Sequence, residues 1–314
     1  MTTALVTGGA GFIGSHLADR LLAEGHRVIS VDDLSTGRIA NLAEARGYGK
    51  EFTFFNMDIR ADGLTPLFER HRPEIVFHLA AQSGVRPSLE DPVKDASINV
   101  MGTLNVLECA SKVGVRKVIY AASGGTLYGE PKRLPVKETV AQGSYPLSPY
   151  GISKKVVLDY LGFYQRYRGL DFTALALGNV YGPRQDPHGE AGVIAIFAAK
   201  MLAGERPAIY GDGNQTRDYV FIDDVVHGFV QAIDRGSTKL VNIGTGLEAS
   251  VNHLYSVLCG ITGFDEEPDR GVLPPGELRR ISLDITRAAS ALAWKPWTHL
   301  EDGLAETVAY LKGV

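Results

Sequence analysis

A glycine-rich turn between an apolar strand and a helix, at the start of the chain, constrains the fold more than any other feature. Residues 3–7 are apolar and strand-like, residues 8–14 read Gly-Gly-Ala-Gly-Phe-Ile-Gly, and residues 15–22 have helical periodicity. Glycine permits a tight turn and lets the backbone approach a pyrophosphate group held at a helix N-terminus. We therefore predict a dinucleotide site whose pyrophosphate is contacted by Gly8, Gly11, Phe12, Ile13 and Gly14.

An acid pair follows the second predicted strand, residues 27–31. Asp32 and Asp33 stand at its carboxyl end, where a carboxylate can bind the adenosine ribose hydroxyls of a dinucleotide. A carboxylate at this place repels a ribose phosphate, so the sequence favours NAD over NADP. Because of Arg38, a few residues further on, the sequence does not exclude NADP as the cofactor.

Strands and helices alternate along the first part of the chain. A helix is predicted at 99–113, where apolar residues recur with helical spacing, and further strands at 51–57, 74–79, 117–121 and 172–177. The alternation predicts an α/β fold, a Rossmann-type doubly wound parallel sheet with helices on both faces. Ligands collect at the carboxyl ends of such strands. Three segments fall there, at 80–82, 123–126 and 178–182.

The texture of the sequence changes beyond about residue 178, where polar loops lengthen. We predict a smaller mixed α/β domain that binds the substrate and is not contiguous in the chain. The boundaries expected are residues 1–178 plus about 217–247 for the NAD-binding domain, and about 179–216 plus 248–314 for the substrate domain.

The composition excludes several classes of function. The chain has 314 residues, 22% of them charged, with a formal net charge of −4 and no basic stripe. Nucleic acid and membranes are therefore not expected partners, and no apolar run approaches the roughly 18 residues of a membrane span. Cys109 and Cys259 are isolated in apolar surroundings and no Cys/His cluster occurs, so we expect a cytoplasmic protein without a metal site.

A tyrosine and a lysine four residues apart indicate the chemistry. Tyr150 and Lys154 share one helix face, and Ser148-Pro149 before them is typical of a helix start. The phenol would lie near the positive end of the helix dipole with an ammonium beside it. Both effects lower a tyrosine pKa from about 10 toward neutrality. The pair therefore predicts a base that removes the proton of an alcohol during its oxidation.

Taken together, these motifs resemble the extended short-chain dehydrogenase/reductase family and, within it, the UDP-hexose 4-epimerases. The resemblance covers essentially the whole chain and lies in residues 7–15, 78–82, 123–129, 150–154, 179–184, 217–220 and 276–284. It implies a resident NAD that takes a hydride from C4 of a UDP-linked hexose and returns it to the opposite face. UDP-glucose and UDP-galactose are the favoured substrates, and a homodimer through the helices near 99–113 and 150–167 is implied.

The resemblance also assigns site residues by matching positions. The cofactor would be held by Lys154 at the nicotinamide ribose and by Ser35, Gly37, Asp58, Ile59, Leu79, Ala80, Ala81, Gln82 and Asn99. The substrate would be contacted by Arg86, Ser88, Asn179, Arg184, Tyr210, Arg217, Arg279 and Ile281. For Arg86 and Arg184 a plain surface or loop role is equally open. Asp218 is expected to orient Arg217 or to tie a turn.

A third polar group in this family hydrogen-bonds the reacting oxygen, and here its identity is ambiguous. The position that commonly holds a Ser or Thr is Gly124. Family members with a Gly-Gly pair at this point use the preceding residue, which is Ser123. Thr126 is the second candidate.

Two positions depart from the family pattern. Pro274 stands where a second phosphate-binding Arg is common, so Arg270, Arg279 or Arg280 would have to replace it. Ile281 matches a position that gates sugar size, and it leaves acceptance of N-acetyl sugars open.

Other activities fit the sequence less well. A nucleotide-sugar 4,6-dehydratase needs an Asp-Glu pair after the active-site Thr, and Gly124-Gly125-Thr126 stands there instead. Residues 84–88 resemble those of UDP-glucuronate 4-epimerases, but Asn179 stands where those enzymes tend to carry Thr. Asp32 opposes an NADPH-dependent 4-ketoreductase. The intact Tyr150/Lys154 pair opposes a protein that senses dinucleotides without catalysis.

Overall fold

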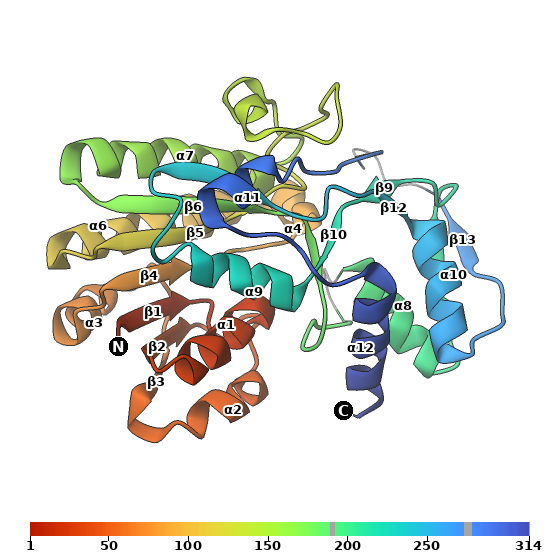
Figure 1. Ribbon diagram of the computed structural model, residues 1–314, viewed down its shortest axis with the longest axis horizontal. Helices are drawn as coiled ribbons and strands as arrows, with labels where there is room; N and C mark the ends of the chain where they lie inside the picture. Colours follow the sequence, from red (N-terminus) through yellow and green to blue (C-terminus); the bar gives the residue numbers. More distant parts are fainter. Residues whose placement is uncertain (189–191, 273–277, 314) are drawn as a thin grey trace.

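The centre of the molecule is a parallel sheet of seven strands. The computed structural model describes residues 1–188, 192–272 and 278–313. The strands lie in the order β11-β6-β5-β4-β1-β2-β3 and all neighbours are parallel (Figure 1). Their bounds are β1 Thr3–Thr7, β2 Arg27–Asp32, β3 Phe52–Asn56, β4 Ile75–His78, β5 Lys117–Ser123, β6 Asp171–Leu177 and β11 Lys239–Ile243. The predicted doubly wound α/β fold is confirmed.

Alternating side chains on each strand fill two separate cores. In β1, Ala4 and Val6 face one cluster of buried side chains while Leu5, between them, faces the other. Successive side chains of a strand point to opposite faces, so both faces of this sheet are covered. The continuous apolar run of β1 is the expected pattern for a strand buried on both sides.

Helices from different parts of the chain cover the two faces (Figure 1). One core is completed by α3 Leu64–His71, α6 Thr103–Val113 and α7 Pro149–Arg168. The other is completed by α1 Phe12–Ala23 and α9 Ile222–Gln231, and α2 Ala43–Arg46 packs against α1. Two short helices, α4 Val85–Glu90 and α5 Pro92–Ala96, follow β4 and contact α7. The predicted helix at 99–113 is a π-helical turn, Ser97–Gly102, that continues into α6.

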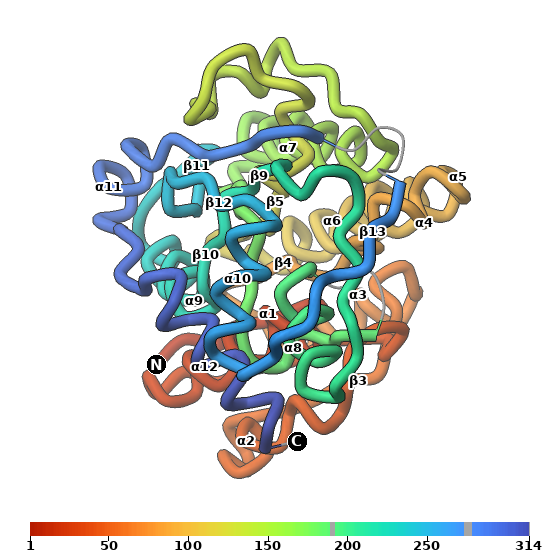
Figure 2. The backbone as a smooth tube through the Cα atoms, turned by 90° about the vertical axis from the view of Figure 1, so that its right-hand side faces the viewer, coloured from red at the N-terminus to blue at the C-terminus, as the bar shows by residue number. Residues whose placement is uncertain are grey.

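The later part of the chain forms a second group of elements beside the carboxyl ends of the strands. Figure 2 looks onto it, with α8 and α10 in the foreground. It contains helices α8 Val193–Leu202, α10 Val251–Thr262 and α12 Leu300–Lys312, whereas α11 Thr286–Leu292 packs against β11 of the main sheet. Three two-stranded sheets complete it: β7 Asn179–Tyr181 with β10 Tyr219–Phe221, β8 Ala208–Tyr210 with β13 Asp269–Gly271, and β9 Thr216–Arg217 with β12 Ala249–Ser250. Domain boundaries in this region stay a prediction.

The buried carboxylate of Asp218 fastens this second group to the main sheet. It accepts hydrogen bonds from the backbone amides of Thr245 (2.7 Å), Gly246 (2.9 Å) and Leu283 (3.0 Å), and from the Thr245 hydroxyl (2.7 Å). The amide of Asn179 donates to its carbonyl oxygen. Asp218 therefore ties turns, one of the two roles expected for it. Within the described residues, we find no helix both long and apolar enough to span a membrane.

Candidate active site

The glycine turn after β1 has no room for side chains. Gly8 has a φ of 70°, in the left-handed region, and a Cβ there would lie 2.8 Å from the backbone nitrogen of Ala80. A Cβ on Gly14 would overlap the carbonyl of Gly8. Helix α1 begins at Phe12, and its N-cap residue Gly11 offers no side-chain cap. The first amides of α1 are thus presented without a capping side chain, which suits an anionic pyrophosphate.

Asp32 lies at the carboxyl end of β2 beside this turn. Its carboxylate accepts hydrogen bonds from the backbone amides of Ala10 (3.0 Å) and Leu34 (2.9 Å). Burial raises the pKa of this carboxyl, and the amides oppose that effect. A Cβ on Gly37 would lie 2.6 Å from the Asp32 carboxylate, so glycine lets the loop close over the acid. The residues present fit a cofactor whose ribose hydroxyls meet this carboxylate.

Other residues assigned to the cofactor are held within their own loops. Asp33 accepts hydrogen bonds from the amide (2.9 Å) and hydroxyl (2.6 Å) of Ser35. Asp58 pairs with Arg60 at 2.5 Å, and the hydrogen bond from that guanidinium lowers the pKa of the carboxyl. Ile59 is buried against Gly102, where a Cβ would touch it. The structure therefore gives these side chains partners of their own before any ligand is considered.

The loop after β4 approaches the glycine turn. Leu79, Ala80, Ala81 and Gln82 are partly buried, and the amides of Leu79 and Ala80 donate to the Thr7 hydroxyl, each at 3.2 Å. The side chain of Asn99 is paired with the backbone of Gln82 rather than pointed at open space. This places the loop where the nicotinamide end of a dinucleotide bound at α1 would reach, at the edge between β1 and β4.

Helix α7 begins where its sequence predicts, and it carries both candidate catalytic side chains. Ser148 is the N-cap, its hydroxyl accepts from the Gly151 amide at 3.2 Å, and Pro149 opens the helix. Tyr150 is hydrogen-bonded to the Ser123 side chain at the end of β5. The Lys154 ammonium is buried, donates to the Ala121 carbonyl at 2.9 Å and lies 5.8 Å from the centre of the Tyr150 ring.

The pKa expected for the Tyr150 phenol is wrong for the protein groups alone. Burial raises the pKa of Tyr150 to about 12, and the Ser123 hydrogen bond only partly opposes this. Burial also lowers the pKa of Lys154 to about 8. The physical reason is desolvation, which disfavours both the phenolate and the ammonium. For Tyr150 to act as a base near neutral pH, its pKa must be lowered by positive charge beyond that of Lys154 and the helix dipole.

The packing around Gly124 explains why the third polar group stands at Ser123. A Cβ on Gly124 would lie 2.7 Å from the Leu283 side chain and 2.9 Å from the Leu177 carbonyl oxygen. A serine cannot be accommodated there without moving a backbone segment. Ser123, one residue earlier, makes the hydrogen bond to Tyr150. The Thr126 hydroxyl is buried without a hydrogen-bond partner among the described residues.

Replacing Ser123 by Ala is expected to lower kcat more than replacing Thr126 by Val. Removing the hydroxyl that touches Tyr150 should cost about 10²-fold, the size of a lost hydrogen bond to a reacting group. The Thr126 variant keeps the side-chain shape and should lose less than about tenfold. Steady-state kinetics of both variants separates the candidates, and a larger loss at Thr126 would reverse the assignment.

Of the other residues assigned to the substrate, one lies beside the catalytic turn and four lie on further segments. The amide oxygen of Asn179 is 3.5 Å from a Cβ placed on Gly125, so Asn179 lies beside the catalytic turn. Arg86 is exposed on α4, and Tyr210 is 45% exposed on β8. Arg217 donates to the Thr216 carbonyl at 2.8 Å and is partly buried. Arg279 is exposed and pairs with Asp212 at 3.3 Å.

Three residues assigned to the substrate are held by other parts of the protein, and their substrate roles stay predictions. Arg184 pairs with Asp19 on α1 at 2.6 Å and with Glu44 at 3.5 Å, so its charge is used to hold its loop on the cofactor side. Ser88 is fully buried and its hydroxyl donates to the Val85 carbonyl at 2.6 Å, within α4. Ile281 is 2% exposed and packs in the core beside Leu283. Pro274, Gly276 and Glu277 lie outside the described residues.

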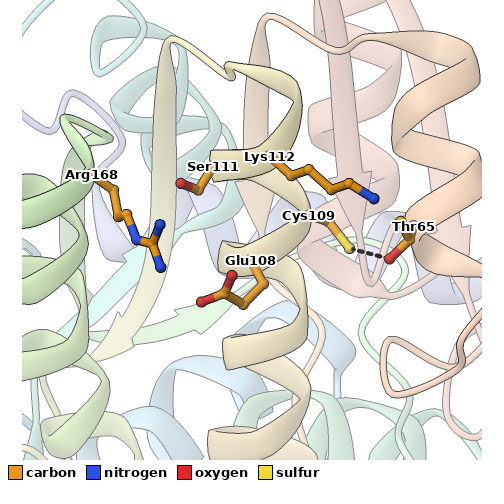
Figure 3. A pocket seen from close by; sticks show the side chains of 6 residues that line it. All are labelled: Thr65, Glu108, Cys109, Ser111, Lys112 and Arg168. Carbon is orange, nitrogen blue, oxygen red and sulfur yellow. Dashed lines mark hydrogen bonds between the residues drawn. The ribbon is translucent and has the colours of Figure 1, made fainter.

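Two small recesses lie elsewhere on the surface. One, of about 290 Å³, is formed by α3, α6 and α7 (Figure 3). Its lining residues are Thr65, Glu108, Cys109, Ser111, Lys112 and Arg168. The other, of about 250 Å³, is bordered by the Arg184–Asp19 pair. Both are separate from the Tyr150 cluster.

Comparisons with known proteins agree with the geometry. The sequence profile of the NAD dependent epimerase/dehydratase family matches residues 4–244. The UDP-glucose 4-epimerase of Mycolicibacterium smegmatis is 48% identical over 309 residues, which is 98% of each chain. The solved UDP-glucose 4-epimerase of Thermotoga maritima with UDP-glucose is similar with a TM-score of 0.95, at 46% identity over 99% of both chains. That of Thermus thermophilus with NAD gives 0.92, at 38% identity over 99% of both.

Proposed function

This chain belongs to the NAD dependent epimerase/dehydratase family, and we propose that it interconverts UDP-glucose and UDP-galactose with a tightly bound NAD. The observation that carries the proposal is the Ser123–Tyr150–Lys154 cluster. It lies at the same edge of the sheet as the glycine turn and Asp32. Inversion at C4 needs an alcohol to be oxidised and the ketone to be reduced from the other side, which requires one base beside one dinucleotide.

The chain's own residues handle the proton and hold the sugar. When bound, NAD⁺ supplies the hydride acceptor and a further positive charge near the phenol. Tyr150 accepts the proton of the C4 hydroxyl and later returns it, with Ser123 donating a hydrogen bond at the reacting oxygen. The Lys154 charge favours the phenolate. Asn179 and Arg217 are proposed to bind the diphosphate while the 4-keto sugar rotates to present its opposite face, because a guanidinium matches phosphate oxygens.

The experiment that tests this function is incubation of the purified protein with a panel of nucleotide sugars and no added cofactor. The panel contains UDP-galactose, UDP-glucuronate, UDP-N-acetylglucosamine and a deoxythymidine-linked hexose, and products are resolved by stereochemistry. UDP-glucose from UDP-galactose is the expected product. Deoxygenated or net-reduced products would identify a dehydratase or a ketoreductase instead. Preferential turnover of the glucuronate or the N-acetyl sugar would change the substrate and keep the reaction type.

We also propose that the protein is a homodimer through the outer face of α7. Ile152, Tyr160, Phe163 and Tyr167 are exposed on this helix, at 55%, 37%, 44% and 67%. Their spacing places them along one side of the helix. Met101, 60% exposed just before α6, extends the same apolar surface. A row of exposed aromatic side chains of this kind is typical of a protein–protein interface.

Replacing Phe163 by Glu is expected to convert the dimer to a monomer, because a buried, unpaired charge is costly in an interface. Size-exclusion chromatography with light scattering measures the molar mass directly. Tyr48→Glu, at a 38% exposed aromatic residue beyond α2, is the matched control and should leave the mass unchanged. A monomeric wild-type protein would contradict the proposal. A cytoplasmic location and the domain boundaries also remain predictions from the sequence.

A further inference from the structure

Asp95 is a buried carboxylate that the sequence analysis does not single out. It lies on α5 and is 0% exposed. Its oxygens accept hydrogen bonds from three side chains: the Ser153 hydroxyl at 2.6 Å, the Asn99 amide at 2.9 Å and the Gln82 amide at 3.2 Å. These donors come from three separate segments of the chain. Burying a carboxylate is costly unless its oxygens accept hydrogen bonds, and these three donors offset that cost.

Two of the donors determine the shape of the loop after β4. The Gln82 side chain bonds to both backbone groups of Gly84, donating to the carbonyl at 2.9 Å and accepting from the amide. The Asn99 side chain accepts a hydrogen bond from the backbone N–H of Gln82 at 2.8 Å and donates one to the backbone carbonyl of Gln82 at 2.9 Å. Asn99 lies in the π-helical turn Ser97–Gly102, a feature often found at functional sites. Asp95 thereby joins α5 and this turn to the loop that carries Ala80 and Ala81.

The third donor, Ser153, belongs to the catalytic helix. It lies on α7 three residues after Tyr150 and directly before Lys154, and it is 4% exposed. A hydrogen bond to Ser153 restrains both the rotation of α7 and its position along its axis. The same carboxylate therefore holds the helix with the base and the loop with the cofactor residues. Loss of either contact is therefore expected to displace Tyr150 relative to the loop after β4.

The charges in this cluster are few. Lys154 is faced by His78 on β4, Tyr120 on β5, Asp95 on α5 and Tyr150 on its own helix. Burial lowers the pKa of His78 to about 3 and raises those of Tyr120 and Tyr150 above the neutral range, so these three groups are neutral. Lys154 and Asp95 are therefore the two charged groups of this cluster. The negative charge of Asp95 raises the pKa of Lys154 against the effect of burial.

We propose that Asp95 is a positioning residue for the proposed epimerisation, because its carboxylate fastens the catalytic helix, through Ser153, to the loop after β4, through Gln82 and Asn99. The inference rests on the proposed function for its kinetic readouts only. Its structural content, the fastening itself, concerns contacts between named segments and can be measured without turnover.

The kinetic test uses Asp95→Ala, Ser153→Ala, the double variant and Asp95→Asn. Asp302→Asn, at an exposed acid on α12 and so away from both the site and the outer face of α7, is the matched control. A displaced base costs up to about 10²-fold, so kcat should fall about 10²-fold in Asp95→Ala and about tenfold in Ser153→Ala. The KM for UDP-galactose should change less than about threefold, and the control should keep wild-type kinetics. Because both residues act through one contact, the double variant should be no slower than Asp95→Ala.

The pH profile gives a readout that a merely structural role would not move. Removing the negative charge in Asp95→Asn lowers the pKa of Lys154 from about 8. The alkaline fall in kcat, where Lys154 loses its proton, should therefore move to lower pH by about one unit. An unmoved limb, kcat values equal to the control, or additive losses in the double variant would overturn the inference.

Hydrogen exchange tests the fastening without any turnover. In Asp95→Ala, amides of α7 and of residues 80–84 should both exchange faster than in the wild type, whereas Ser153→Ala should affect α7 alone. Unchanged exchange in both segments would overturn the proposal even if epimerisation were confirmed. If the wild type lacks epimerase activity, the proposed function fails and the exchange result still decides this one. If Asp95→Ala does not fold, Asp95→Asn and Ser153→Ala carry the test.

Discussion

Replacing Tyr150 by Phe is expected to lower kcat for UDP-galactose by about 10²- to 10⁴-fold, the usual contribution of a general base. Phe keeps the ring that packs 5.8 Å from the Lys154 ammonium and removes only the hydroxyl bonded to Ser123. The fold and the cofactor should therefore be retained. The measurement is steady-state kinetics, with the NAD content of the purified variant determined after denaturation.

Tyr145→Phe is the control for this experiment, because Tyr145 is 87% exposed in the loop before α7. It should keep wild-type activity. A loss of less than about tenfold in Tyr150→Phe, with NAD still bound, would show that another group takes the proton. A variant that has lost its NAD would have to be reconstituted with the cofactor before the rates are compared.

Replacing Gly14 by Ala is expected to abolish tight NAD binding and to destabilise the protein. The new Cβ would overlap the Gly8 carbonyl and lie 2.8 Å from the Cα of Gly9, and neither backbone group can rotate away. Overpacking of this kind costs about 1–3 kcal/mol in the free energy of unfolding. Shifting the turn also removes the close approach that a pyrophosphate needs, so NAD affinity should fall at least about 10²-fold.

Calorimetric titration of NAD into cofactor-free protein and denaturant unfolding measure the two effects of Gly14→Ala. The control is Gly260→Ala on α10, where a Cβ would meet nothing within 4 Å. That substitution should leave NAD binding unchanged and raise the unfolding free energy by up to about 1 kcal/mol, because alanine favours a helix over glycine. NAD affinity in Gly14→Ala within threefold of the wild type would contradict our account of the turn.

Local features of this site could be predicted from the sequence because their physics is local. The strand before the glycine turn and the Asp32 at the end of the next strand follow from periodicity and composition, and β1 and β2 lie where they were expected. Ser148-Pro149 predicted the start of α7, because a cap and its helix are adjacent in the chain. The family, the reaction type and the NAD cofactor are confirmed by the comparisons.

Features that depend on folding could not be predicted in the same way. The partner of Arg184 is Asp19, 165 residues away, and no pattern connects the two. The pKa of Tyr150 rises because the folded chain removes water from the phenol, a term absent from a helix considered alone. No sequence pattern marks Asp95 for a related reason, since its partner Ser153 is 58 residues distant. Its spacing of four from Asn99, which allows a side-chain hydrogen bond on a helix, was the one available signal.

The position of Asp218 has a consequence for how the sugar enters and leaves. Two segments far apart in sequence, residues 245–246 and Leu283, converge on the single carboxylate of Asp218, which is 1% exposed. Parting the two groups of elements like a hinge would break all of these contacts together and leave a charge without partners in a dry interior. Substrate exchange should then proceed by small movements of peripheral loops. The 4-keto sugar would then rotate inside a site whose shape does not change. This limits how large a substituent the hexose can carry.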